Sequence, residues 1–490
     1  MQILEFIASL FVFVVGLGVL AIVVVFVADV TQRKTALRRN FPVIGHFRYA
    51  FERLGTFFRQ YFFAMDREEL PFNRAQRAWA YRAAKNVDNT VAFGSTRDLR
   101  EPGSVLFVNT PFPTLNQDAV PPHAVTVGAG CPQPYVTRAI FHISGMSYGA
   151  ISQPAVLALS QGAQRAGCWM NTGEGGLTPW HLEGGADLVF QIGTAKNGVR
   201  TLDGALSEAD VREVAAHPQV KMFEIKLSQG AKPGKGGILP AAKVTEEIAR
   251  IRHVRAGEDA ISPNRHPDIR DNDELLDMIV RVRTLSGKPV GIKAALGGPD
   301  WLDALFARIR ARGADCAPDF FTIDGAEGGT GAAPLALIDD MGLPLREALP
   351  MLVDKLTEHG LRERVKVVAS GKLVTPADVA WALCVGADFA VSARGFMFAL
   401  GCIQSLQCNR NTCPTGIATH NPRLQRGLIP TEKAERVAAY QRNMTYEVGV
   451  IAHACGVREP RELNRSHCRV VTPSGLSVPL HVLHPGPARA

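Results

Sequence analysis

The feature that most restricts the fold of this chain is a repeated alternation of β-rich runs with helical segments. After about residue 105, runs of branched and aromatic residues alternate with segments rich in Ala, Leu and Arg. This pattern predicts parallel strands joined by crossover helices. The predicted strands are residues 139–143, 188–192, 222–226, 290–293, 320–323, 366–369 and 389–391. The predicted helices are residues 154–166, 243–252, 273–284, 301–312, 344–358 and 376–385.

Polar, glycine-rich sequences follow nearly every predicted strand. A (β/α)8 barrel builds its site from loops in this position, and roughly eight strand–helix units fit the chain. The sequence has no GxGxxG followed by an acidic ribose-binding residue, so it does not support a Rossmann domain. We therefore predict the α/β class, with a TIM barrel over residues 105–430 and a C-terminal extension over residues 431–490.

A stretch without charged residues runs from Phe6 to Ala28. As a helix it is long enough to span a hydrocarbon core of ~30 Å. A cleaved signal peptide is the alternative, but Glu5 precedes the stretch and the basic residues follow it. We predict a transmembrane helix over residues 1–30. The basic residues after it predict a single-pass membrane protein whose remaining chain faces the cytoplasm.

The next segment, residues 31–104, is rich in aromatic and basic side chains. Two predictions are equally compatible with this composition. In one, the segment lies along the bilayer interface, with its aromatic side chains inserted and its basic groups in water. In the other, it forms a helical collar packed on the following domain. Both predictions keep the barrel near the membrane.

The composition excludes several other classes of protein. Apolar residues make up 46% and charged residues 20% of the chain, which excludes disorder for most of it. The 54 basic and 46 acidic residues leave a net charge of +8 without any nucleic-acid-binding motif, so we expect a membrane surface rather than nucleic acid as the partner. Nine cysteines are too few for a secreted disulfide scaffold and indicate a reducing compartment.

Two neighbouring strand ends offer groups that bind phosphate. Ser370 and Gly371 follow one predicted strand, and Ala393 and Arg394 follow the next. Small residues let backbone N–H groups approach an anion closely, and barrels commonly bind phosphate after their last two strands. The alternative is a pair of ordinary strand–helix turns.

Three cysteines, Cys402, Cys408 and Cys413, are crowded into one short segment. Thiolates are soft ligands that suit iron–sulfur clusters or zinc, but the spacing C-x5-C-x4-C is not that of the common C-x2-C zinc site. Three ligands without an evident fourth predict a 3Fe-4S cluster, and three free core thiols are the alternative. The other cysteines are scattered singly and are predicted to be core residues.

Six motifs follow one another along the predicted barrel. They are MSYGAIS (146–152), NTGEGG (171–176), QGAKPG (229–234), ISPNRHPDI (261–269), GGTGAAP (328–334) and CNRNTCPTGIAT (408–419). This succession resembles the FMN-binding synthase domain of glutamate synthase, and the resemblance covers about residues 90–430. It implies a TIM barrel that binds FMN and a 3Fe-4S cluster. It also implies an enzyme that reduces 2-iminoglutarate, formed from 2-oxoglutarate and ammonia, to L-glutamate.

The resemblance assigns roles to individual residues. Glu174 is expected to handle protons or ammonia near the imine. Gln229 and Lys232 are expected to meet 2-oxoglutarate. Lys293 is expected to stabilise the reduced flavin. The residues that the resemblance places around FMN are Met146, Ser147, Asn171, Gln191, Lys293, Asp324, Gly329, Ser370, Gly371, Ala393 and Arg394.

The sequence also departs from the family pattern. Glutamate synthases begin with a glutaminase domain, whereas this chain begins with Met1 and Gln2, so we expect it to use free ammonia. Lys235 and Ile238 stand where the family commonly has an acid and an amide, which favours a changed substrate. The sequence has no evident nicotinamide site, so the expected electron donor is ferredoxin or a membrane redox partner.

Three alternative functions remain open at this point. The first is an N-methylglutamate synthase-like enzyme that incorporates an amine. The second is an amino-acid oxidoreductase that passes electrons to the quinone pool. The third is a membrane-anchored FMN subunit that transfers electrons without turnover of its own.

Overall fold

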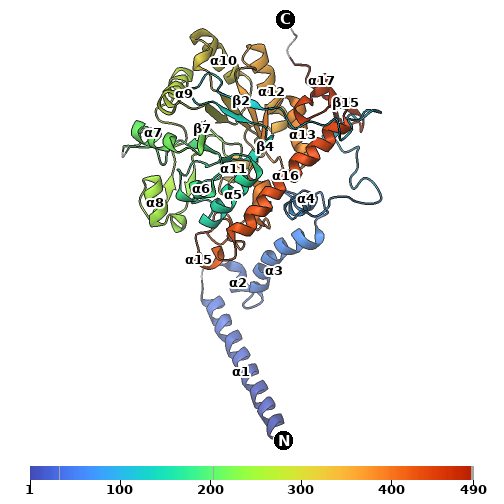
Figure 1. Ribbon diagram of the computed structural model, residues 1–490. Helices are drawn as coiled ribbons and strands as arrows, with labels where there is room; N and C mark the ends of the chain where they lie inside the picture. Colours follow the sequence, from blue (N-terminus) through green and yellow to red (C-terminus); the bar gives the residue numbers. More distant parts are fainter. Residues whose placement is uncertain (33, 202, 487–490) are drawn as a thin grey trace. The chain divides into compact units, whose positions relative to one another are not determined.

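The computed structural model describes residues 1–32, 34–201 and 203–486. The chain forms two compact units, Met1–Ala75 and Gln76–Ala490. The larger unit contains a closed barrel of parallel strands in the order β10-β11-β12-β13-β4-β5-β6-β7 (Figure 1). The predicted TIM barrel is therefore confirmed.

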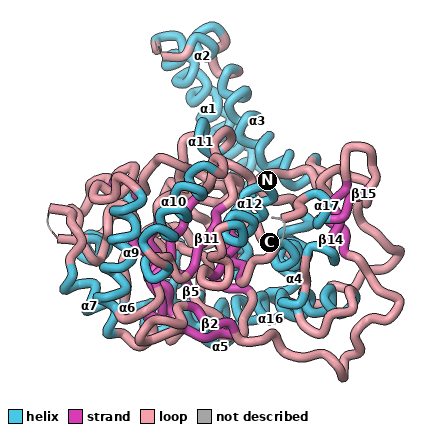
Figure 2. Tube along the Cα trace, turned by 90° about the horizontal axis from the view of Figure 1, so that it is seen from above, coloured by secondary structure: helices cyan, strands magenta, loops and turns pink. Residues whose placement is uncertain are grey.

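Short strands alternate with longer helices around the barrel, and helices α9, α10 and α12 lie outside the strands (Figure 2). The strands are β4 (Phe141–Ile143), β5 (Met170–Asn171), β6 (Leu188–Ile192), β7 (Val220–Lys226), β10 (Val290–Ala294), β11 (Phe320–Asp324), β12 (Lys366–Ser370) and β13 (Phe389–Ser392). The α-helices are α5 (Gln153–Ala166), α6 (Pro179–Gly184), α7 (Glu208–Ala216), α8 (Glu246–Arg252), α9 (Asn272–Ser286), α10 (Asp300–Arg312), α11 (Leu335–Ile338), α12 (Leu345–Glu358), α13 (Pro376–Val385) and α14 (Arg394–Leu400). The 3-10 turns are η2 (Ala241–Lys243) and η3 (Ala314–Cys316).

Local signals in the sequence explain where the barrel helices begin and end. The Ser152 hydroxyl accepts a hydrogen bond from the Ala155 N–H at the start of α5, and Gly167 ends the helix with a φ of 68°. Thr375 and Asp378 form a reciprocal capping box at the start of α13. These caps fix where each crossover helix begins and ends, and therefore how long the connection is. The carboxyl ends of the strands then meet at one rim of the barrel.

All seven predicted strands belong to the barrel, and each predicted helix has a counterpart. The eighth strand, β5, is missing from the prediction because it has only two residues and leads into a glycine-rich loop. Helix α7 is also missing from it. Outside the barrel, the sequence forms β1 (Val105–Phe107), β2 (Val125–Val127), β3 (Tyr135–Thr137), β8 (Ile238–Leu239) and β9 (Ala260–Ile261).

The C-terminal part of the chain packs against the barrel helices. Helix α16 (Pro430–Ala454) packs against α5, α13 and α14. Strand β14 (Cys468–Val471) lies between β1 and β15 (Ser477–Pro479) in a small antiparallel sheet. The remaining short elements here are α15 (Pro422–Gln425), η4 (Pro460–Glu462), η5 (Arg465–His467) and α17 (Leu480–Leu483). The region that follows residue 430 is therefore folded onto the barrel rather than a separate tail.

The smaller unit contains one long apolar helix and several short ones. An 18-residue window of helix α1 (Gln2–Thr31) has a mean hydropathy of 3.3, and the helix is long and apolar enough to cross a membrane, although a signal sequence has the same properties. It is followed by α2 (Ala36–Asn40), α3 (Gly45–Phe58) and the π-helical turn η1 (Arg59–Phe63). The predicted segment of residues 31–104 is shared between the two units, because α4 (Arg74–Ala84) falls almost entirely in the larger one.

Candidate active site

The predicted site residues lie at or near the carboxyl ends of the barrel strands. Because all eight strands are parallel, these ends share one rim of the barrel. Met146 and Ser147 follow β4, and Glu174 follows β5. The others lie in β5, β6, the loop after β7, β10, β11 and its following loop, β12 and the residue after it, and the turn from β13 into α14: Asn171, Gln191, Gln229, Lys232, Lys293, Asp324, Gly329, Ser370, Gly371, Ala393 and Arg394.

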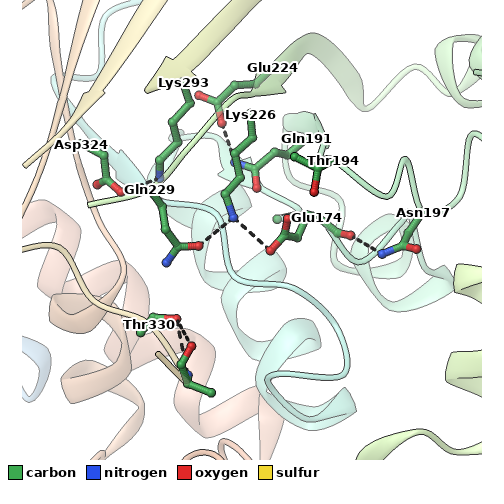
Figure 3. A network of polar contacts seen from close by, with 12 residues as sticks. Glu174, Gln191, Thr194, Asn197, Glu224, Lys226, Gln229, Lys293, Asp324 and Thr330 are labelled. Atoms are coloured by element: carbon green, nitrogen blue, oxygen red, sulfur yellow. Dashed lines mark hydrogen bonds and ion pairs between the residues drawn. The ribbon is translucent and has the colours of Figure 1, made fainter. Parts of the chain in front are cut away.

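An ammonium–carboxylate pair lies at the centre of this rim. The Nζ atom of Lys226, at the end of β7, lies 2.9 Å from Oε1 of Glu174 and donates to Oε1 of Gln229 at 2.7 Å (Figure 3). The Gln229 amide in turn donates to the Gly329 carbonyl at 3.3 Å. The structure therefore joins Glu174 to Gln229 through Lys226, a residue that the sequence analysis did not select.

The Glu174 carboxylate is held in its ionised form by its surroundings. Burial by itself would raise the pKa of Glu174, but the ammonium of Lys226 and further cations nearby hold that pKa below its usual value. The surrounding glycines leave room for the carboxylate, because a Cβ atom at Gly193 would lie 2.5 Å from its Oε2 and one at Gly237 would lie 2.8 Å from its Oε1. Neither glycine tolerates a side chain while Glu174 stays in place.

Two more cations approach Glu174, one from the loop after β7 and one from the end of α8. Burial lowers the pKa of Lys232 to about 8, against the opposing charge of Glu174. Burial likewise lowers the pKa of Arg252 to about 10, and its guanidinium donates to the Tyr148 carbonyl at 2.6 Å. The rim therefore presents an excess of positive charge around one carboxylate, which suits an anionic substrate.

A second polar cluster surrounds Asp324 at the end of β11. Its Oδ1 accepts from the Ser370 hydroxyl at 2.7 Å, and its Oδ2 accepts from the Gly230 N–H at 2.9 Å. The Lys293 ammonium lies 3.5 Å from the same Oδ2 (Figure 3). This cluster brings together three residues predicted for the FMN site, Asp324, Ser370 and Lys293, from three adjacent strands.

A buried carboxylate lies deeper in the barrel and was not predicted. Oε1 of Glu224, on β7, accepts from the amide groups of Asn171 at 2.8 Å and Gln191 at 2.6 Å, and its Oε2 accepts from the Thr322 hydroxyl at 2.5 Å. Glu224 and Lys226 are two residues apart on one strand, so they share its inward face. Alternating charges inside an apolar strand are the sequence signal that identifies both residues.

Glu224 fixes how two predicted FMN-binding residues present their polar atoms. Because both amide nitrogens are committed to Glu224, the carbonyl oxygens of Asn171 and Gln191 point elsewhere. The Asn171 oxygen accepts from the Gly173 N–H at 2.9 Å. The Gln191 amide therefore keeps its carbonyl oxygen as an acceptor and its second N–H as a donor for anything bound at the rim.

The three predicted cluster ligands follow helix α14 in one loop. Cys402 and Cys408 are partly exposed, and Cys413 is buried. A metal ion is usually held by ligand atoms of His, Cys, Asp or Glu that lie close together. Within the described residues, one group has three such atoms within 4.8 Å of one another, and it consists of Asp303, Glu358 and His359. The three sulfurs are thus further apart than the ligands of a single ion.

The surroundings of this loop favour a thiolate at Cys413 but not at Cys402, whose pKa burial raises. Burial by itself would raise the pKa of Cys413, but the Thr415 hydroxyl and neighbouring backbone N–H groups hold it below its usual value. The Arg394 guanidinium lies 3.8 Å from the Cys408 sulfur. The buried ammonium of Lys243 donates to the Cys408 carbonyl at 3.2 Å. Positive charge and N–H donors around cysteines fit a cluster whose thiolates each bind a different iron atom.

The sequence of this chain is similar to the sequences of one protein family. The conserved region of glutamate synthase matches residues 114–458 of the chain. The glutamate synthase large subunit-like protein YerD of Bacillus subtilis is 39% identical over 503 aligned positions, which cover 94% of this chain and 95% of that protein. The chain belongs to the glutamate synthase family. It is a glutamate synthase-like oxidoreductase.

Other relatives share the barrel over a smaller part of their length. The archaeal glutamate synthase [NADPH] of Methanocaldococcus jannaschii is 37% identical over 336 positions, covering 67% of this chain and 62% of that protein. Among solved structures, a flavocytochrome b2 variant with benzoylformate is 16% identical with a TM-score of 0.49, covering 90% of this chain and 92% of that one.

Proposed function

We propose that this protein reduces 2-iminoglutarate, formed from 2-oxoglutarate and ammonia, to L-glutamate, with FMN and an iron–sulfur cluster as cofactors. The observation that carries this proposal is the Lys226–Glu174–Gln229 network, which lies at the mouth of a glutamate synthase-family barrel. The cations around this network would attract a dicarboxylate substrate. The Glu174 carboxylate would exchange protons with it.

The residues around Asp324 fit FMN. Ser370 and Gly371 lie at the end of β12, where their backbone N–H groups would donate to the phosphate, and Arg394 in the first turn of α14 would supply a cation for it. Asn171, Gln191 and Lys293 would meet the flavin ring, with Lys293 stabilising its reduced form. FMN, when bound, supplies the hydride. Met146, Ser147, Gly329 and Ala393 complete the proposed flavin site.

The loops that follow β5 and β7 would hold the substrate. Lys232 and Gln229 would bind the carboxylates of 2-oxoglutarate, since an ammonium and an amide N–H donate to carboxylate oxygens. Glu174 would take a proton from the nitrogen as ammonia adds to the ketone and pass it to the oxygen that leaves as water. Lys226 acts by holding Glu174 ionised and oriented.

Cys402, Cys408 and Cys413 would bind the cluster, with 3Fe-4S as the proposed type because the loop offers three thiolates. Electrons would enter through it from ferredoxin or a membrane redox partner. Replacing Cys408 by Ser tests this route. We expect lower iron content and no turnover with an external donor, while chemically reduced flavin is still reoxidised by substrate. Full iron content with full turnover contradicts the route.

We also propose that α1 crosses the membrane once, with the barrel on the cytoplasmic side. The helix has an apolar window without buried residues, and basic side chains follow it. The proposed segments are the transmembrane helix of residues 1–30, the juxtamembrane segment of residues 31–104, the barrel and the C-terminal extension.

A changed substrate is the second candidate, and Lys235 and Ile238 favour it. Lys235 is exposed on the β7 loop, while Ile238 pairs with Ile261 in the two-stranded β8–β9 sheet and directly follows Gly237, which approaches the Glu174 carboxylate. An apolar side chain this close to the site would suit methylamine or another amine. Comparing ammonium with methylamine as the nitrogen source distinguishes the two candidates.

The deciding experiment is anaerobic mixing. The detergent-solubilised protein is reduced, mixed with 2-oxoglutarate and ammonium, and followed by its visible flavin absorbance while glutamate is assayed. We expect flavin reoxidation with a stoichiometric amount of glutamate. A bound flavin that stays reduced contradicts the glutamate proposal and leaves the electron-transfer alternative.

A further inference from the structure

The turn after α1 is fixed by polar contacts within the N-terminal unit. The Asp29 carboxylate is buried and accepts hydrogen bonds at 2.9 Å from the Val43 N–H and from Nε2 of His46. The Gln32 amide donates to the Asp29 and Thr35 carbonyls at 3.2 and 2.8 Å. These bonds tie the first turn of α3 to the last turns of α1. Figure 1 shows α2 and α3 gathered at the end of α1 that lies away from the N-terminus.

Helix α3 and the turn η1 carry a continuous apolar surface, which we call the aromatic face. In α3 its members recur at the helical spacing of i, i+4, i+7 and i+11, so they share one side of the helix. The exposed fractions of its side chains run from 42% to 66%. The aromatic face consists of Phe47, Phe51, Leu54, Phe58 and Phe62. An exposed stripe of large aromatic side chains indicates an interaction surface.

The charges next to the aromatic face are almost all positive. Residues 34–63 contain six Lys or Arg residues and one acidic residue, a net charge of +5. At the turn angle of an α-helix, Arg48 and Arg59 lie on one flank of the face and Arg53 on the other. All three side chains are exposed. This arrangement complements anionic lipid headgroups, which attract basic residues near the bilayer surface.

We propose that the aromatic face inserts into the interface of an anionic bilayer beside the point where α1 leaves it. This inference rests on the membrane span proposed above, because the Asp29 contacts place α3 at the end of that helix. The aromatic side chains lie at the boundary between headgroups and acyl chains, and the flanking arginines bind lipid phosphates. The surface holds the start of the cytoplasmic chain against the membrane.

Tryptophan fluorescence in liposomes tests this inference on the full chain. Phe51→Trp places a tryptophan on the aromatic face, Thr56→Trp places one on the opposite, exposed side of the same helix, and Phe13→Trp reports on α1. The lipids carry bromine near the start of their acyl chains or deep within them, with phosphatidylglycerol as the anionic component. The wild-type protein is measured in parallel, and its signal is subtracted.

We expect shallow bromines to quench Phe51→Trp about twofold, since an interfacial face lies ~5–10 Å deep. Thr56→Trp stays unquenched, and deep bromines quench Phe13→Trp. If Phe13→Trp is quenched while Phe51→Trp behaves like Thr56→Trp, the surface inference is overturned and the span stands. If neither Phe13→Trp nor Phe51→Trp is quenched, both are overturned. The emission of Phe51→Trp is also measured at several protein concentrations. If it changes with protein concentration but not with bromine, the aromatic face contacts a second copy of the chain, and the inference is overturned.

The role of the basic flanks is tested separately. In the background of Phe51→Trp, the triple change Arg48→Gln, Arg53→Gln and Arg59→Gln removes the positive charge but keeps the aromatic face. We expect quenching of the parent variant to increase with the phosphatidylglycerol fraction and quenching of the triple variant to be independent of it. An equal dependence in both proteins contradicts the charge complementarity.

Discussion

At the mouth of the barrel, charged side chains are largely buried and paired, whereas in the N-terminal unit apolar side chains are exposed along two helices. Lys226 and Glu174 keep their charges because each lies within 2.9 Å of the other. Phe51, by contrast, is 66% exposed and has a basic side chain on either side of its helix. Buried charges need partners inside the protein, while exposed aromatic surface needs a partner outside it. The difference separates the proposed site for a small ligand from the proposed membrane surface.

The largest expected effect comes from breaking the pair at the mouth. Glu174→Gln removes the proton acceptor and leaves Lys226 without its counterion. We expect turnover with 2-oxoglutarate and ammonium to fall by about 10²–10⁴-fold, the usual contribution of acid–base catalysis. The flavin content is measured alongside and is expected not to change. Glu246→Gln, at an exposed position in α8, is the matched control. Equal turnover in both variants contradicts the role of Glu174.

A smaller effect concerns the protonation of Lys232, whose pKa burial lowers to about 8. The ammonium binds a carboxylate only while protonated, so the KM for 2-oxoglutarate is expected to rise as the pH rises through about 8. Lys232→Met is expected to raise the KM by about 10- to 100-fold, the value of a charge-assisted hydrogen bond. Its KM no longer changes over this pH range. A variant that retains the wild-type pH profile shows that another group is responsible.

The next effect tests whether the buried charge below the rim acts on the flavin. Glu224→Gln keeps the size of the side chain and an acceptor for Asn171 and Gln191, but removes the negative charge. We expect the flavin midpoint potential to become more positive, by about 20–30 mV for an interaction on the order of 1 kcal/mol. Thr322→Val removes one hydrogen bond without changing charge and is the control. Identical potentials in all three proteins contradict this role of Glu224.

The smallest effect concerns the polar turn of the N-terminal unit. Asp29→Asn keeps an acceptor for the Val43 N–H but loses the charge that strengthens the bond. A loss of ~1 kcal/mol is expected to speed amide hydrogen exchange around Val43 about fivefold in the detergent-solubilised protein. Glu52→Gln, on the exposed side of α3, is the control. Unchanged exchange in Asp29→Asn shows that other contacts hold the turn.

Much of the fold was predictable because its signals are local. Seven strands and the main crossover helices follow from runs of branched residues, caps and glycines, such as Ser152 and Gly167 around α5. Strand β5 was missed because two residues carry no periodicity. Glu224 and Lys226 were also missed, because the partner of Glu224, Gln191, lies on another strand and the partner of Lys226, Glu174, lies in a loop.

The sequence by itself determined the class of fold, the apolar helix α1 and the glycine-rich loops at the strand ends, because strand and helix periodicities, caps and long apolar runs are local properties of a chain. Only the tertiary structure decided which charges pair. Closing the barrel brings the ends of all eight strands to one rim, so that Glu174 meets Lys226 and Asp324 meets Lys293 and Ser370. Electrostatic pairing depends on distance in space, which the order of residues does not contain.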